Sequence, residues 1–160
     1  MSETVIQVSS LGKRIKGKTI LEDISFEINQ GDCVALIGPN GAGKTVLMSC
    51  ILGDKKPSNG QVLIDGKAGK AKNKIAVLLQ ENTIPNSLKV EELIAFFQSI
   101  SDNPLTNQEV QDLLQFKGDQ YQQFADKLSG GQRRLLAFVL CLIDKPKILF
   151  LDEPTAGMDT

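Results

Sequence analysis

The sequence contains no histidine, only three cysteines and no long apolar run. Cys33, Cys50 and Cys141 each fall within an apolar segment, so we expect core residues in a reducing compartment rather than a disulfide or a metal set. The longest apolar stretch, 135–143, is too short to span a bilayer. The first residues do not resemble a secretory signal, so we expect a soluble chain that reaches a membrane only through a partner.

No charge of one sign dominates: the sequence has 18 basic and 19 acidic residues, which gives a formal net charge of −1. Without a basic field, nucleic acid is not expected as the main partner. The length of 160 residues predicts one domain or part of one, long enough to bury a real core.

One stretch fits the phosphate-loop pattern G-x-x-x-x-G-K-[ST], namely Gly38, Pro39, Asn40, Gly41, Ala42, Gly43, Lys44 and Thr45. The apolar run 33–37 before it predicts a buried strand. Apolar residues at helical spacing after it predict a helix that Gly53 ends.

The residue types of this loop suit phosphate chemistry. Its glycines let the main chain approach a ligand closely, so successive N–H groups can bind phosphate oxygens at the start of a helix. We expect Lys44 to reach the β- and γ-phosphates and the Thr45 hydroxyl to ligate Mg²⁺. The alternative, an ordinary glycine-rich turn, is disfavoured by the flanking strand and helix.

The rest of the chain predicts an α/β fold. An antiparallel β layer comes first, with strands at 5–8 and 24–28 and a hairpin over 13–20. Further strands are expected at 61–64, 74–79 and 147–151, and helices over 90–100, 106–116 and 132–143. The lysines of 66–74 favour a solvated loop over a phosphate site.

Two later stretches carry chemical groups. The apolar strand 148–151 ends at Asp152 and Glu153, which suit a Mg²⁺ ligand and a base that polarises the attacking water; alone, such a pair more often caps a strand. Ser129, Gly130, Gly131 and Gln132 open the third helix, as a second anion-binding end or as a plain N-cap. One ligand cannot easily use both helix starts within a monomer.

Together these features resemble the ATP-binding domain of an ABC transporter. The phosphate loop is similar to the family's Walker A, Gln80 to its Q-loop glutamine, and 128–132 to its signature. Residues 148–153 are similar to Walker B, and 156–159 to the D-loop. The sequence around Gln80 and at 153–159 is most similar to that of multidrug and antibiotic exporters.

The resemblance implies a P-loop fold in which 1–80 and 145–160 form the catalytic core and 81–144 a helical subdomain. It also implies a head-to-tail dimer in which ATP lies between Walker A of one copy and the signature of the other. Ser129 and Gly131 would then contact the γ-phosphate, with Gly130 and Gln132 beside them. Gln80 would sense Mg²⁺ and the attacking water.

The partner implied by the family is an integral membrane permease, contacted by the helical region 81–125. The apolar residues of this region, Phe96 and Phe97 among them, are expected to be mostly core, with an interface role for one of them as the alternative. The chain would therefore be cytoplasmic, at the inner face of the membrane. ATP hydrolysis with Mg²⁺ would drive export through that permease.

Two departures from the family pattern stand out. Ile15 occupies the place of the aromatic residue that usually stacks on adenine, and no histidine is present to act as the family's switch residue. The family continues beyond residue 160 to the strand that carries this histidine, so we expect an incomplete core sheet and impaired stability and turnover. Two alternatives stay open: a remnant that binds nucleotide without efficient hydrolysis, and a soluble ABC ATPase without a permease.

Overall fold

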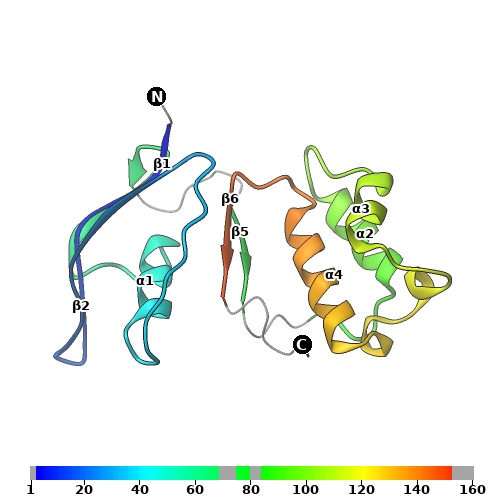
Figure 1. Ribbon diagram of the computed structural model, residues 1–160, viewed down its shortest axis with the longest axis horizontal. Coiled ribbons are helices and arrows are strands. Elements are labelled where there is room, and N and C mark those ends of the chain that lie inside the picture. The colour runs from blue at the N-terminus through cyan, green and yellow to red at the C-terminus, as the bar shows by residue number, and fades with distance from the viewer. Residues whose placement is uncertain (1–2, 69–74, 80–83, 153–160) are drawn as a thin grey trace. The chain divides into compact units, whose positions relative to one another are not determined.

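A computed structural model of the chain describes residues 3–68, 75–79 and 84–152. The chain divides into two compact units, Met1–Lys72 and Asn73–Thr160, and each is described by itself. Figure 1 shows the strands of the first unit in blue and green and the helices of the second in green to orange.

The first unit is built on a long antiparallel hairpin. Strands β1 (Thr4–Ile15) and β2 (Lys18–Asn29) are joined by a two-residue turn in which both residues have positive φ, Lys16 at 49° and Gly17 at 78°. Such turns match the twist of the strands that they join. Strands β3 (Asn59–Ile64) and β4 (Lys67–Ala68) complete the sheet in the order β2-β1-β3-β4. The predicted antiparallel layer is therefore confirmed.

Burial along β1 changes parity in mid-strand. Ile6 and Val8 are buried, and so is Leu11, three residues later rather than two. The register against β2 shifts between Val8 and Leu11, where Ser10 adopts a φ of 43°. The bulge adds one residue to the strand, so it keeps apolar side chains on the buried face on both sides of it.

The prediction of a buried strand at 33–37 is wrong. In the described part of the chain no strand pairs with this segment, and Val34, Leu36 and Ile37 are 60%, 47% and 90% exposed. Cys33 is also exposed rather than in a core, whereas Cys50 is buried and Cys141 partly buried. An apolar run becomes a buried strand only where neighbouring strands supply ladder hydrogen bonds and other elements cover its faces.

The second unit combines a short parallel sheet with helices. Strands β5 (Ile75–Leu78) and β6 (Ile148–Leu151) pair in parallel, with Ile75 opposite Ile148 and Leu78 opposite Leu151. The helices are α2 (Val90–Ser99), α3 (Asn107–Leu114) and α4 (Gly130–Leu142), with 3₁₀ turns at Gln120–Gln122 and Ala125–Lys127. Helix α4 packs on β5 and carries much of the core.

The predicted helical faces are largely confirmed. Helix α4 buries Leu136, Val139 and Leu140 at the expected spacing. Helix α2 buries Val90, Leu93 and Ile94, but Ile100 follows the helix and is 65% exposed. Helix α3 ends at Leu114 rather than at 116 because Gln115 takes a left-handed conformation, with a φ of 51°.

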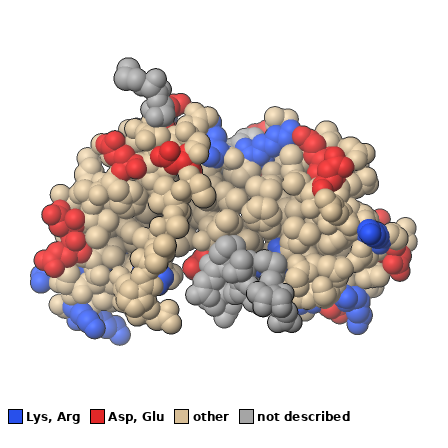
Figure 2. Space-filling model, in the orientation of Figure 1, with Lys and Arg blue, Asp and Glu red and all other residues tan. Residues whose placement is uncertain are grey.

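The face in Figure 2 shows acidic and basic side chains on both units, so no single-sign field covers it. Among the described helices, none is long and apolar enough to cross a membrane.

Candidate nucleotide site

The phosphate loop leads into helix α1 (Lys44–Ile51), as predicted. Gly41 and Gly43 have φ of 81° and 90°, in the left-handed region that favours glycine. Gly43 is the N-cap of α1, and no side chain caps the helix there. The first N–H groups of a helix have no intrahelical partner, so this uncapped end can donate to phosphate oxygens.

The loop also packs closely on β2. A Cβ added at Gly43 would lie 2.9 Å from Leu21 Cδ2 and 3.2 Å from the Ile20 carbonyl oxygen. The glycine is therefore required twice, by its backbone angle and by this contact. Gly53, with a φ of 78°, follows the end of α1, as predicted.

Lys44 lies across the loop. Its Nζ donates to the carbonyl oxygens of Gly38 at 2.6 Å and of Pro39 at 2.9 Å. The ammonium group thereby holds the loop in a curve and stays beside the N-terminus of α1. Thr45, in the first helical turn, is exposed. The phosphate contact of Lys44 and the Mg²⁺ contact of Thr45 stay predictions.

The signature stretch opens α4 with a reciprocal cap. The Gln132 amide donates to Ser129 Oγ at 3.2 Å, and the Ser129 amide donates to Gln132 Oε1 at 3.0 Å. This bears out the N-cap interpretation and leaves the anion-binding one open, because Ser129 and Gly130 are exposed. A Cβ added at Gly131 would meet nothing within 4 Å, so no packing within the chain requires this glycine.

Asp152 follows β6 at the carboxyl end of the parallel sheet. Its amide donates to the Leu78 carbonyl at 2.9 Å, which extends the β5–β6 ladder by one bond. Leu79 therefore lies at the same sheet end as Asp152. Gln80 and Glu153 come next in the sequence, but both lie outside the described residues, as do residues 156–159 of the predicted D-loop.

Arg134 is a residue that the sequence interpretation missed. Its Nη1 donates to the Leu79 carbonyl at 2.7 Å and its Nη2 to the Asp152 carbonyl at 3.2 Å. Seven residues along the same helix, the Cys141 thiol contacts the Val77 carbonyl at 3.7 Å, and burial raises its pKa. The spacing of 134 and 141 could have indicated that Arg134 shares a helical face with a core residue.

The residues that suit Mg²⁺ supply hard oxygen ligands, the Thr45 hydroxyl and the Asp152 carboxylate. Among residues 3–68, 75–79 and 84–152 no cluster of three acidic or sulfur ligands forms a metal site by itself. Thr45 belongs to the unit Met1–Lys72, and Asp152 to the unit Asn73–Thr160. In each unit, taken by itself, the residue present supplies a hard oxygen ligand, which is the type that this ion prefers.

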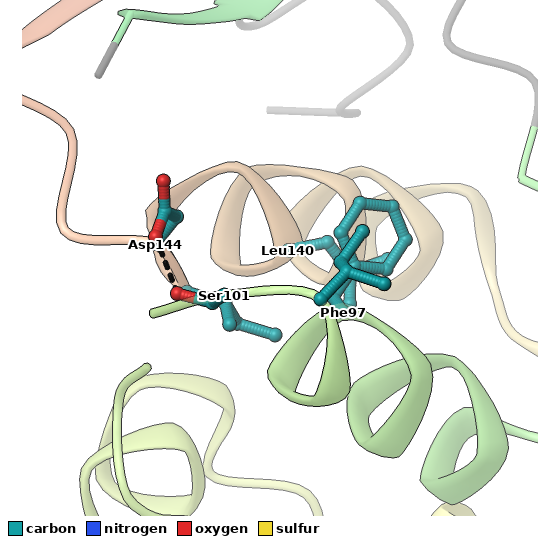
Figure 3. A pocket seen from close by; sticks show the side chains of 6 residues that line it. Phe97, Ser101, Leu140 and Asp144 are labelled. Atoms are coloured by element: carbon teal, nitrogen blue, oxygen red, sulfur yellow. Dashed lines mark hydrogen bonds between the residues drawn. The ribbon is translucent and has the colours of Figure 1, made fainter. Parts of the chain in front are cut away.

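A small pocket of about 110 Å³ lies between the ends of α2 and α4. Phe97 and Leu140 line one side, and Ser101 donates to the Asp144 carboxylate on the other (Figure 3). The two polar side chains of this pocket form a hydrogen bond with each other, and its other lining residues are apolar.

Comparison with known proteins decides the family. The family profile described as ABC transporter matches residues 21–156. The chain belongs to the ABC transporter family. It is 33% identical to the spermidine/putrescine import ATP-binding protein PotA of Spiroplasma citri, over 99% of this chain and 48% of that protein. It is also 33% identical to the Nod factor export ATP-binding protein I of Ralstonia nicotianae, over 99% of this chain and 52% of that protein.

Solved structures of the family share the fold. An ATP-binding subunit of an ABC transporter aligns with a TM-score of 0.78 and 25% identity, over 97% of this chain and 68% of that one. The expected ABC-type P-loop fold, with an antiparallel layer and a parallel sheet, is therefore confirmed. The chain spans about half the length of the curated relatives that it matches.

Proposed function

We propose that this chain is an ATP-binding subunit of an ABC transporter and that it binds and hydrolyses ATP with Mg²⁺. The observation that carries the proposal is the geometry of the phosphate loop. Two left-handed glycines lead into the uncapped start of α1, and Lys44 lies across the loop beside that helix end. Exposed backbone donors and one cation together suit a polyphosphate.

The residues divide the chemistry between them. The amides at the start of α1 and the Lys44 ammonium bind the β- and γ-phosphates. Mg²⁺ would neutralise charge that develops on the phosphate oxygens, and Thr45, Asp152 and Gln80 would hold it. Glu153 accepts a hydrogen bond from the attacking water and orients it toward the γ-phosphate.

The signature supports a dimer in which each ATP contacts two copies. Ser129, Gly130, Gly131 and Gln132 would approach the γ-phosphate bound by the other copy. Exposure of Ser129 and Gly130 and the open space at Gly131 favour contact with a group from outside the chain. A ligand that binds only the dimer stabilises it by mass action, so ATP would promote dimerisation and hydrolysis would release it.

The partner proposed for the helical region is a membrane permease, which would place the chain on the cytoplasmic face of the membrane. Phe96 and Ile100, 55% and 65% exposed, give this region apolar surface for such a contact. We also propose the division into a catalytic core, 1–80 and 145–160, and a helical subdomain, 81–144. Export stays a prediction, because the relatives named above include one import and one export protein.

The first test is ATP hydrolysis by the purified chain with Mg²⁺, beside a Glu153→Gln variant and a nucleotide-binding titration. We expect turnover that the variant abolishes while it retains ATP binding. Binding without turnover would favour the second candidate, a nucleotide-binding protein without efficient hydrolysis. The exposed segment before the loop favours that candidate, since in the described residues no strand pairing holds 33–37.

The permease part of the proposal has its own test. Affinity purification of the tagged chain from detergent-solubilised membranes should recover an integral membrane protein in a fixed ratio. Recovery of the chain from the soluble fraction alone would favour a soluble ABC ATPase. A Phe96→Ser, Ile100→Ser variant is expected to reduce the recovery without changing nucleotide binding.

A further inference from the structure

We propose that Arg134 is a positioning residue for ATP hydrolysis, which holds the backbone leading into Gln80 and Glu153 at a fixed place relative to the signature end of α4. The inference rests on the ATPase function proposed above. It assigns a role to a side chain that lies outside the phosphate loop, the signature residues 129–132 and the 148–153 stretch.

The geometry places one guanidinium group between two strand ends. Arg134 Nη1 and Nη2 each donate to a different carbonyl, those of Leu79 and Asp152. We call this pair of bonds the Arg134 clamp. A planar guanidinium presents its N–H groups in a rigid fork, so it can fix two acceptors relative to one another; a lysine ammonium cannot do so with the same geometry.

The clamp lies at the end of the hydrogen-bonded pairing between β5 and β6. The Asp152 amide still donates to the Leu78 carbonyl at 2.9 Å. The carbonyls that follow in each strand, Leu79 and Asp152, share the one arginine. Leu79 directly precedes Gln80 in the sequence, and Asp152 directly precedes Glu153. A shift of either carbonyl therefore shifts the peptide bond that links it to a proposed catalytic residue.

The other end of the connection is the signature. Arg134 lies five residues after Ser129, about 7.5 Å along the axis of α4. The helix start is fixed by the reciprocal bonds between Ser129 and Gln132, and its body packs on β5. A rigid helix with these two attachments can transmit a displacement at the signature to the clamp.

The test compares Arg134→Lys and Arg134→Gln with wild type, and uses Arg133→Gln as the control. Arg133 is the neighbouring arginine on α4, and its Nε has no hydrogen-bond partner within the described part of the chain. We expect kcat to fall on the order of 10- to 100-fold in Arg134→Gln, because small misplacements of catalytic groups have effects of this size. The KM for ATP should change less than about threefold, and Arg134→Lys should retain intermediate activity.

A second measurement reports on the clamp without turnover. Backbone amide exchange should quicken several-fold in peptides covering 79–84 and 152 onward in both Arg134 variants, while peptides of β1 and β3 keep their wild-type rates. If wild type binds ATP without turnover, the ATPase proposal fails. The amide exchange measurement then tests by itself whether Arg134 holds the two strand ends. Wild-type kcat in Arg134→Gln, an equal loss in Arg133→Gln, or unchanged exchange in Arg134→Lys would each overturn the inference. Arg134→Lys carries the test if Arg134→Gln does not fold.

Discussion

Helices α1 and α4 both begin at glycine-rich sequences, but the two starts are built differently. Helix α1 starts at a left-handed Gly43, and no side chain caps it. Helix α4 starts at Ser129, whose side chain and backbone both bond to Gln132. The first start leaves its donors to a ligand, whereas the second has already satisfied part of its own hydrogen bonding.

The glycines differ in the same sense. Gly43 faces inward, because a side chain there would collide with β2. Gly131 faces open space, so its lack of a side chain serves no packing within the chain. Packing within the chain therefore requires the glycine before α1, whereas no such packing requires Gly131. Substitutions at the two sites should separate stability from function.

The largest effect is expected for Gly43→Ala. Alanine would combine a strained φ with a Cβ 2.9 Å from Leu21 Cδ2, so we expect a loss of about 3 kcal/mol in the free energy of unfolding. Denaturant titration measures the change. Gly31→Ala is the matched control, because Gly31 has a φ of 89° but nothing within 4 Å. It should lose only about 1 kcal/mol. Equal losses would show that crowding by β2 contributes nothing.

Ser129→Ala should have the next largest effect. It removes the acceptor of the Gln132 amide, and the loss of an N-cap typically costs about 1 kcal/mol. Ser129→Asn restores a capping oxygen and should lose only a few tenths of a kcal/mol. The free energy of unfolding of both variants provides the measurement. If asparagine were as destabilising as alanine, the cap would not be the source of the loss.

Gly131→Ala should change stability less, and in the opposite direction. Alanine meets open space in the first turn of α4, so we expect a gain of about 0.5 kcal/mol. ATP hydrolysis and ATP-dependent dimerisation should nevertheless fall, because the added methyl group would occupy space that the proposed partner copy approaches. Calorimetry tests the expected gain in stability. Turnover and light scattering with ATP test the expected loss of hydrolysis and of dimerisation. Unchanged turnover would remove the functional reason for this glycine.

The smallest effect compares the α4 cap with the similar cap of α3. There the Glu109 amide donates to Thr106 Oγ1, and the Thr106 amide donates to Glu109 Oε2 at 2.7 Å. The bond from the Thr106 amide lowers the pKa of the Glu109 carboxyl most, and hydrogen bonding from the Thr106 side chain lowers it further. The stabilisation is therefore present above the usual pKa of about 4.3 and is lost as the pH falls through the lower folded value.

We therefore expect acid to loosen the start of α3 while the uncharged Ser129–Gln132 pair keeps α4 capped. NMR amide shifts of Glu109 and Gln132 between about pH 6 and pH 3 report on the two caps. Glu109→Gln should remove the pH dependence at α3. Parallel changes at both amides would point to general unfolding rather than to a titrating cap.

Much of the fold could be predicted because its signals are local. Gly43 and Gly53 mark the beginning and end of α1, and Ser129 caps α4. The apolar face of α4 follows from a period of 3.6 residues. The phosphate loop could likewise be predicted from residue types and spacing, whereas the signature was identified through the resemblance to the family.

The segment 33–37 shows where local signals stop. Its apolar composition predicted a buried strand, yet Ile37 is 90% exposed. A strand needs partners for its backbone, and composition does not say whether these partners are at hand. Apolar residues make burial of a segment favourable, but the segment is buried only where neighbouring strands and helices pair with it and cover it.

By itself, then, the sequence determined most of the helices and strands, the cap at Ser129 and the phosphate loop, because each depends on residues close together in the chain. The tertiary structure decided that Arg134 reaches the carbonyls of Leu79 and Asp152, which lie 55 and 18 positions away. It also decided that Gly43 is crowded and Gly131 is open. These properties depend on contacts between segments far apart in sequence, which no local pattern encodes.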